Sequence, residues 1–231
     1  MIYKKWKTFY DKILKDFNFD YEKDFESAKF LDGILSDEKK LDINKIEKLI
    51  EKNNILIFGA GPSLTNSIRR VKNELKNFVV ICADGATSAF IENEIIPDII
   101  VTDLDGKVSD QINANKNGSI VLIHAHGNNI DKINKYVKKF EGKLIATTQT
   151  DPNEFKNLYN FGGFTDGDRC VFLADHFNAR KINLLGFDYN GEIGKYSFPK
   201  NKNEKIKLKK LSWCRYLIDQ LKSENPNIEY W

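Results

Sequence analysis

Six short apolar runs between residues 55 and 186 constrain the fold of this chain most strongly. They are rich in Val, Ile and Leu and cover residues 55–59, 78–82, 98–102, 119–123, 143–147 and 181–186. Such runs are typical of strands buried on both faces of a sheet. The intervals 64–75, 87–93, 130–140 and 167–178 have helical patterns. Alternation of buried strands with helices predicts an α/β fold with a doubly wound, mostly parallel sheet of about six strands.

The first 52 residues follow a different pattern. Their apolar residues recur at helical spacing, as in Trp6, Tyr10 and Ile13, and no strand-like run precedes Ile55. We predict a helical N-terminal segment (1–52) packed on an α/β catalytic domain (53–231). Because the segment lacks convergent polar groups, we expect it to make no phosphate contact; its aromatic residues would cover the core or form a homodimer contact. A long loop is predicted over 187–205 and a closing amphipathic helix over 205–224.

Composition excludes several classes of protein. The net charge of +3 argues against a dominant nucleic-acid-binding surface. No apolar run approaches the roughly 20 residues that span a membrane, and the charged start does not resemble a signal peptide, so we expect a cytoplasmic protein. The three cysteines are far apart and without CxxC spacing, which argues against a disulfide framework or a structural zinc site.

Polar residues follow the predicted strands where each of them ends. In doubly wound sheets, ligands bind at the carboxyl ends of the strands, near the point where strand order reverses. The sequence therefore predicts a site at this edge. Its candidate residues are Gly59, Gly61, Pro62, Ser63, Asp84, Gly85, Asp103, Asp105, His124, His126, Thr147, Thr148 and Asp188.

The loop Gly59-Ala60-Gly61-Pro62-Ser63 follows the first run. Its glycines would let the backbone approach a phosphate, and Ser63 is a candidate N-cap of the next helix. The loop matches neither GxGxxG nor a Walker A motif, because Leu64 stands at the third glycine position and no Gly-Lys-Ser/Thr follows. A tight turn with a good cap is the alternative.

Asp103 and Asp105 are two residues apart, so along an extended segment both carboxylates would point to one side. Asp84 would join them from the neighbouring strand end. Three carboxylates at a cleft suit Mg²⁺, which binds through carboxylates, waters and substrate phosphates. The alternative for Asp103–Asp105 is a solvated turn.

His124 and His126 would share a face of the fourth strand. No third ligand stands at zinc spacing, so hydrogen bonding to phosphate or general-base catalysis is favoured for His126. His124 could equally be a buried core residue.

The glycine-rich segment 160–170 leads into a helix that Thr165 or Asp166 could cap. Arg169 could donate a forked pair of hydrogen bonds to phosphate oxygens. Lys195, Lys209 and Lys210 are further phosphate candidates, with a solvated helix face or loop as the alternative.

Together these motifs resemble a known family. The segment ICADGATSAFIENEIIPDIIVTDLDG resembles the signature of the thiamine pyrophosphokinase fold. With GAGPSL, HAHG, FGGFTDGDR, LLGFD and the helical start FDYEKDFESAKFLDGIL, the chain resembles the archaeal 6-hydroxymethyl-7,8-dihydropterin pyrophosphokinases over nearly its whole length.

The resemblance implies transfer of diphosphate from ATP to a small pterin alcohol, giving AMP, with Mg²⁺, in methanopterin biosynthesis. It implies that Asp84, Asp103 and Asp105 hold the metal, and that Thr165, Asp166 and Arg169 face the triphosphate or the acceptor. Asp166 and Asp188 are candidates to bind the ring edge.

The sequence departs from the family pattern in two places. After HAHG we expect an acid, but the chain has Asn128 and Asn129, with Asp131 the nearest acid. The acids that precede Thr-Asp in thiamine enzymes are replaced by Asn160, Gly162 and Gly163. The second departure argues against thiamine as acceptor.

Two other functions are compatible with the same residues. A glycosyltransferase-like enzyme would consume a nucleotide sugar, against which the small size of the chain argues. A non-catalytic nucleotide-binding module would not need acids, His and Arg at one place. Release of AMP rather than ADP from ATP would separate the three.

Overall fold

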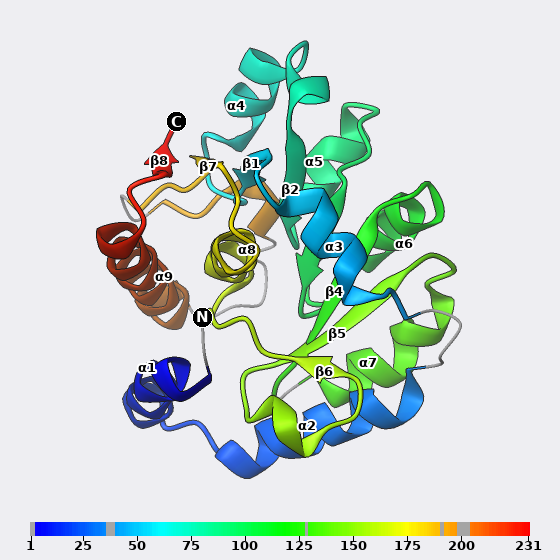
Figure 1. The fold of residues 1–231 in the computed structure, drawn as a ribbon, viewed down its shortest axis with the longest axis vertical. Coiled ribbons are helices and arrows are strands. Elements are labelled where there is room, and N and C mark those ends of the chain that lie inside the picture. Colours follow the sequence, from blue (N-terminus) through cyan, green and yellow to red (C-terminus); the bar gives the residue numbers. More distant parts are fainter. Residues whose placement is uncertain (1–2, 36–39, 128, 190–191, 198–203) are drawn as a thin grey trace.

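The computed structural model describes residues 3–35, 40–127, 129–189, 192–197 and 204–231 (Figure 1). Within them, eight parallel strands form one sheet in the order β6-β5-β4-β3-β2-β1-β7-β8. The six predicted strands are confirmed as β1 (Asn54–Phe58), β2 (Val79–Ala83), β3 (Ile99–Thr102), β4 (Ile120–Ala125), β5 (Leu144–Thr148) and β7 (Lys181–Leu185). The short strands β6 (Leu158–Tyr159) and β8 (Ile228–Tyr230) add one strand at each edge.

Both faces of the sheet are buried, as the apolar runs predict. In β1, Ile55 and Ile57 join one hydrophobic cluster, while Leu56 joins another on the opposite face. The first face is covered by α1 (Tyr3–Phe17), α3 (Ile43–Ile50), α8 (Asp166–His176) and α9 (Glu204–Glu224). The second is covered by α2 (Tyr21–Ile34), α4 (Leu64–Val71), α5 (Ala86–Glu92), α6 (Val108–Lys116) and α7 (Ile130–Tyr136).

The predicted helices correspond to α4, α5, α7, α8 and α9, with ends that differ by a few residues. The 3-10 turns Leu75–Asn77 and Val137–Lys139 complete the intervals predicted at 64–75 and 130–140. The helix α6 has no counterpart among the predicted intervals. Of the predicted loop over 187–205, the structure describes 187–189, 192–197 and the start of α9, with a 3-10 turn at Lys195–Ser197.

The N-terminal helices pack on the sheet with their apolar stripes, as expected. Trp6 and Tyr10 of α1 are each 1% exposed and lie in the same cluster as β1. On α2, Leu31 packs in the cluster of β3, β4 and β5. The aromatic residues of α1 thus cover the core, while the domain boundary at residue 52 and the homodimer stay predictions.

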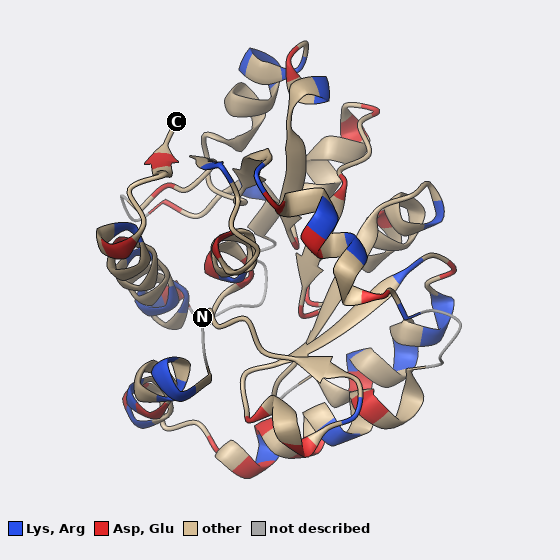
Figure 2. Ribbon diagram, viewed as in Figure 1, with Lys and Arg blue, Asp and Glu red and all other residues tan. Residues whose placement is uncertain are grey.

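Strand order reverses beside β1. From β1 the chain proceeds strand by strand to β6 and then returns to place β7 on the other side of β1. Figure 2 shows Lys, Arg, Asp and Glu mainly on helices and loops, whereas the central strands are almost free of them. Because parallel strands end at one edge, the polar residues after β1–β5 and β7 meet there.

In the described parts of the chain, none of the helices combines the length and apolar character needed to cross a membrane.

Candidate active site

A cleft of about 670 Å³ lies at the carboxyl ends of the strands. Twelve of the predicted site residues line it: Gly59, Gly61, Asp84, Gly85, Asp103, Asp105, His126, Thr165, Asp166, Arg169, Asp188 and Lys210. The predicted residues that are not among the described residues lining it are Pro62, Ser63, His124, Thr147, Thr148, Lys195 and Lys209. The expected gathering of strand ends is therefore found, although some predicted residues lie outside the cleft wall.

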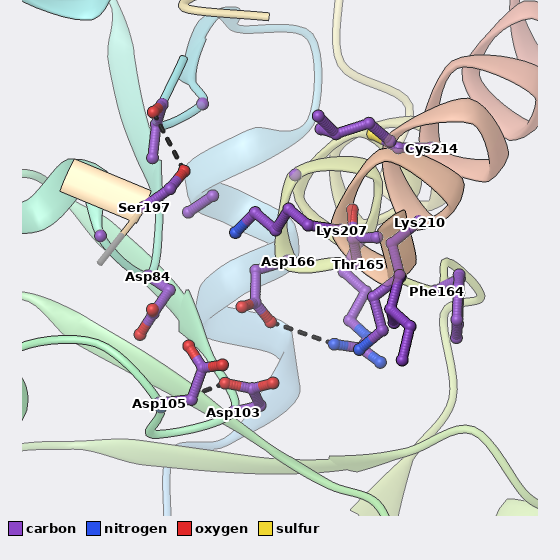
Figure 3. A pocket seen from close by; sticks show the side chains of 18 of the residues that line it. Asp84, Asp103, Asp105, Phe164, Thr165, Asp166, Ser197, Lys207, Lys210 and Cys214 are labelled. Atoms are coloured by element: carbon purple, nitrogen blue, oxygen red, sulfur yellow. Dashed lines mark hydrogen bonds and ion pairs between the residues drawn. The ribbon is translucent and has the colours of Figure 1, made fainter. Parts of the chain in front are cut away.

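Three carboxylates meet at the centre of this cleft. Asp84, Asp103 and Asp166 each offer one oxygen atom, and these atoms lie within 4.8 Å of one another. In Figure 3 the side chains of Asp84, Asp103 and Asp105 lie together on one side of Asp166. The predicted metal set contained Asp105 in place of Asp166. Asp105 also lines the cleft but lies outside this group of three.

The segment between Asp103 and Asp105 is a turn and not extended. Leu104 has a left-handed backbone (φ 66°) and is buried, and the Asp105 N–H donates to Asp103 Oδ1 (3.1 Å). The expectation of an extended segment between the two acids is therefore wrong, although both residues line the same cleft. A left-handed leucine is costly unless its surroundings hold it, and such strain concentrates at functional sites.

Neighbouring groups fix the position of Asp84. Its Oδ1 accepts hydrogen bonds from Thr102 Oγ1 (2.7 Å) and Gln111 Nε2 (2.5 Å). A Cβ atom at Gly106 would lie 2.5 Å from Asp84 Oδ2, so glycine at this position leaves space for the carboxylate.

The pKa values of the three acids shift in different directions. Burial, with the charges of Asp105 and Asp103, raises the pKa of Asp84 to about 7. Burial and the charge of Asp103 also raise the pKa of Asp166, despite Arg169. For Asp103, burial is outweighed by the hydrogen bond and charge of His126 and by Arg169 and Lys210, so its pKa lies well below the usual range. A divalent cation would offset the repulsion among these carboxylates.

His126 pairs with one of these acids. Its Nε2 lies 3.1 Å from Asp103 Oδ2, at the border of the cleft. His124 is instead a buried residue of β4, with Nδ1 3.0 Å from Thr147 Oγ1. Burial and the charge of Arg169 lower the pKa of His124 well below its ordinary value, so the imidazole is neutral.

Asn129 stands close to the position of the expected additional acid, but it has a scaffold role. Its Nδ2 donates to the carbonyl oxygens of His124 (2.7 Å) and Asp103 (3.1 Å), and its Oδ1 accepts from Ser27 Oγ (2.9 Å). Asn129 therefore ties the ends of β3 and β4 to α2. Asp131 is exposed on α7, and Asn128 lies outside the described residues.

Asn129→Asp is expected to lower the free energy of unfolding by about 3 kcal/mol. The change replaces two buried N–H donors with a buried charge that faces two carbonyl oxygens. Urea unfolding would measure the loss, with Asn66→Asp on the exposed face of α4 as control. A loss below about 1 kcal/mol would show that Asn129 does not act as this scaffold.

The loop that follows β1, residues 59–63, packs against the end of β7. Ser63 donates both its N–H (2.9 Å) and its Oγ–H (2.8 Å) to Asp188 Oδ2 and does not cap α4 with its side chain. A Cβ atom at Gly61 would collide with the same carboxylate, and one at Gly59 would lie 2.7 Å from the Gly186 oxygen. These glycines permit close approach of two loops, and Asp188 already fills the anion position at Ser63.

Two other residues that were predicted to bind the substrate, Pro62 and Thr148, do not line the described cleft. Pro62 is exposed. Thr148 is buried at 1% exposure, with Oγ1 2.9 Å from Thr150 Oγ1.

The conformation at the start of α8 accounts for the glycines of the segment that precedes it. Thr165 caps the helix in a capping box with Asp168, as one of the two predicted caps. Gly163 has φ +91°, and a Cβ atom there would lie 2.7 Å from the Cα atom of Arg169. Arg169 is 7% exposed; it donates from Nη1 to Asp166 Oδ1 (3.0 Å) and from Nη2 to Gln149 Oε1 (3.3 Å).

Lysines from α9 complete one wall. Lys207 and Lys210 line the cleft and extend from α9 into it (Figure 3). Lys210 was predicted, and Lys207 was missed, although positions 207, 210 and 214 share one helix face. Lys209 instead pairs with Asp16 (2.8 Å), and Lys195 pairs with Glu92 (3.6 Å) on the surface.

The N-terminal segment contributes a part of the cleft that the sequence did not indicate. Asn18, Phe19, Asp20, Lys23 and Asp24 line it. The expectation that this segment lacks convergent polar groups is therefore wrong, because Asp24 accepts hydrogen bonds from Gly127 N (2.6 Å) and Gln149 Nε2 (2.6 Å).

Comparisons with known proteins place the chain in a family. Relatives named 6-hydroxymethyl-7,8-dihydropterin pyrophosphokinase occur in Methanocaldococcus jannaschii (45% identity, covering 96% of each chain), Methanothermobacter thermautotrophicus (42%, 98% of each) and Pyrococcus furiosus (39%, 96% of this chain and 95% of that one). A solved glycosyltransferase, Maf from Magnetospirillum magneticum AMB-1, aligns with 71% of this chain and 28% of its own at 14% identity; its TM-score of 0.37 is too low to bear on fold or function. With residues 34–193 matching its sequence pattern, the chain belongs to the family described as 6-hydroxymethylpterin diphosphokinase MptE-like.

Proposed function

We propose that the protein transfers diphosphate from ATP to the hydroxymethyl group of 6-hydroxymethyl-7,8-dihydropterin, a step of tetrahydromethanopterin biosynthesis. The acceptor oxygen forms a bond to the β-phosphorus, and the bond from that phosphorus to the oxygen bridging to the α-phosphorus breaks. AMP leaves with the bridging oxygen, and the acceptor hydroxyl loses a proton. The names of the relatives support this reaction.

The observation that carries the proposal is the meeting of three carboxylates with a buried arginine in one cleft. Asp84, Asp103 and Asp166 supply oxygen ligands, and Arg169 and Lys210 supply positive charge beside them. Diphosphate transfer needs positioning and charge stabilisation more than covalent chemistry, and this arrangement provides both.

The donor set fits Mg²⁺. Hard carboxylate oxygens are its preferred protein ligands. Burial and the charges of neighbouring acids raise the pKa values of Asp84 and Asp166, and a cation would relieve the repulsion among these acids. Asp84, Asp103 and Asp166 would hold the ion. When bound, Mg²⁺ would neutralise phosphate charge and orient the phosphate oxygens.

The basic residues would stabilise the charge that develops towards AMP. Arg169 is held by Asp166 and Gln149, and its Nε–H has no acceptor in the described part of the chain. Preorganised donors of this kind stabilise a transition state without reorganisation during the reaction. Lys207 and Lys210 approach the same place from α9.

His126 is the group that we propose as proton acceptor. With its Nε2–H donated to Asp103 Oδ2 at 3.1 Å, Nδ1 is the nitrogen that can take the acceptor proton. An ionised carboxylate that fixes a histidine tautomer in this way also stabilises the imidazolium that forms.

Incubation of the protein with ATP, Mg²⁺ and hydroxymethyl-dihydropterin is expected to give AMP and the pterin diphosphate in equal amounts. Chromatography of the nucleotides and ³¹P spectra of the products would measure both. Omitting the pterin, or adding EDTA, is expected to stop AMP formation. ADP as product, or AMP without pterin diphosphate, would contradict the proposal.

A further inference from the structure

One wall of the cleft comes from the turn that joins α1 to α2. We name it the α1–α2 lobe and define it by Asn18, Phe19, Asp20, Lys23 and Asp24, all of which line the cleft. Asn18 has a left-handed backbone (φ 53°), which turns the chain sharply between the two helices. These residues belong neither to the group formed by Asp84, Asp103 and Asp166 nor to the basic residues that we propose to contact phosphate.

The lobe carries an aromatic ring that faces open space. Phe19 is 43% exposed, although its ring centroid lies 5.1 Å from that of Phe17 and 6.4 Å from that of Phe164. Phe164 also lines the cleft, directly before the Thr165 cap of α8. A single exposed phenylalanine needs no explanation, but this ring borders a cavity and has a second cleft aromatic beside it.

The lobe is fixed to the strand ends that hold the chemistry. Asp24 is 4% exposed and accepts from Tyr10 Oη (2.5 Å), Gly127 N (2.6 Å) and Gln149 Nε2 (2.6 Å). Gly127 follows His126, and Gln149 accepts from Arg169. Phe19 is therefore attached to the side of the cleft where His126 and Arg169 lie.

The opposite side of the cleft has a different lining. Gly59 and Gly61 pack against Gly186 at the point where strand order reverses, with Phe187 beside Gly59 and Tyr196 beside Gly85. This is the position where doubly wound sheets bind nucleotides. In-line transfer requires acceptor and leaving group on opposite sides of the transferred phosphorus. The three acids lie between the two sides of the cleft. If the nucleoside of ATP binds at the side formed by β1 and β7, the acceptor would bind on the other side, at the α1–α2 lobe.

We propose that the α1–α2 lobe is the acceptor subsite and that the planar ring of the pterin stacks on Phe19. Heteroaromatic rings stack favourably on aromatic side chains, with a contribution that is lost on truncation to alanine. The inference rests on the proposed function. It assigns part of the active site to the helices that precede the α/β domain.

The test separates the two substrates. Phe19→Ala is expected to raise KM for hydroxymethyl-dihydropterin by about tenfold or more, with KM for ATP changed by less than about threefold. Phe19→Tyr, which keeps a stacking ring, is expected to retain a KM close to that of the wild type. Tyr216→Ala is the matched control, because Tyr216 is 41% exposed on α9 and does not line the described cleft.

Equilibrium binding provides a readout that does not depend on turnover. The probes are 6-hydroxymethylpterin, followed by its own fluorescence, and an ATP analogue with a methylene bridge between the α- and β-phosphates. Phe19→Ala is expected to weaken only the pterin probe, by about tenfold. Weakening of the ATP analogue instead, or of neither probe, would overturn the subsite assignment even where the wild type makes pterin diphosphate. Wild-type protein that makes no pterin diphosphate would instead contradict the proposed function itself.

Discussion

Asp103→Asn is expected to reduce kcat/KM for diphosphate transfer by at least about a thousandfold, which is ~4 kcal/mol of transition-state stabilisation. Asp103 is the acid of the group whose pKa lies lowest, because His126, Arg169 and Lys210 stabilise its charge. Among the three proposed ligands, it would thus be the one that is ionised before a cation binds. Asparagine keeps the shape and can still accept from His126, but it lacks the charge that attracts Mg²⁺.

The fold should survive this change. Asp103 loses the stabilisation that His126, Arg169 and Lys210 give its charge, while its repulsion with Asp84 and Asp166 is relieved, so the melting temperature is expected to change little. Kinetics and thermal unfolding would be measured together with binding of Mn²⁺, a paramagnetic substitute for Mg²⁺. Turnover within about tenfold of the wild type would remove Asp103 from the metal site.

Asp105→Asn is the matched control for this experiment. It changes the same functional group two residues away in the same cleft, but Asp105 lies outside the group formed by Asp84, Asp103 and Asp166. We expect less than about a tenfold loss. Equal losses in both variants would instead favour the metal set that the sequence alone indicates, with Asp105 as a ligand.

The main strands and the edge that carries the site could be predicted because their signals are local. A run such as Ile55–Phe58 is apolar throughout, and its residues enter clusters on opposite faces of the sheet. Chain direction then brings all the strand ends to one edge, whatever the details of packing. This is why predicted residues from separate strand ends line one cleft.

The elements that were missed lack such signals. The strands β6 and β8 have only two and three residues, too few for a periodic pattern. The helix α6 buries Gln111 and Asn115, which bond to Asp84 and to the Ser119 oxygen, so its buried face does not read as apolar. Polar burial of this kind becomes recognisable only when the partners are in place.

The features of the site that differ from the sequence-based expectation have a tertiary origin as well. The left-handed backbone of Leu104 turns the Asp103–Asp105 segment, and the α8 helix brings Asp166 to the carboxylates of Asp84 and Asp103. Likewise, Ser63 reads as a helix cap in sequence, but Asp188 from a distant loop takes its hydrogen bonds. Spacing along the chain cannot indicate which of several nearby acids converge in space.

Arg169 is the second residue whose replacement should have a large effect. It is one of few arginines in a chain where Lys and Arg together number 36, and it is almost fully buried at the start of α8. Its guanidinium spans two partners, Asp166 Oδ1 at 3.0 Å and Gln149 Oε1 at 3.3 Å, while it borders the cleft. A lysine at this position keeps the charge but cannot reproduce the planar fork.

Arg169→Lys is therefore expected to lower kcat by about tenfold or more, and Arg169→Ala by about a hundredfold or more, with little change in melting temperature. Loss of stability should be small, because Asp166, whose pKa burial already raises, can take a proton when its partner is removed. Arg215→Lys is the control, since that arginine is exposed and pairs with Asp219 at 3.6 Å on the surface of α9. Steady-state kinetics with ATP and pterin varied in turn, together with thermal unfolding of each variant, would measure both effects. If the lysine variant turned over like the wild type while the alanine variant were merely less stable, Arg169 would be a structural partner of Asp166 and not a clamp for phosphate.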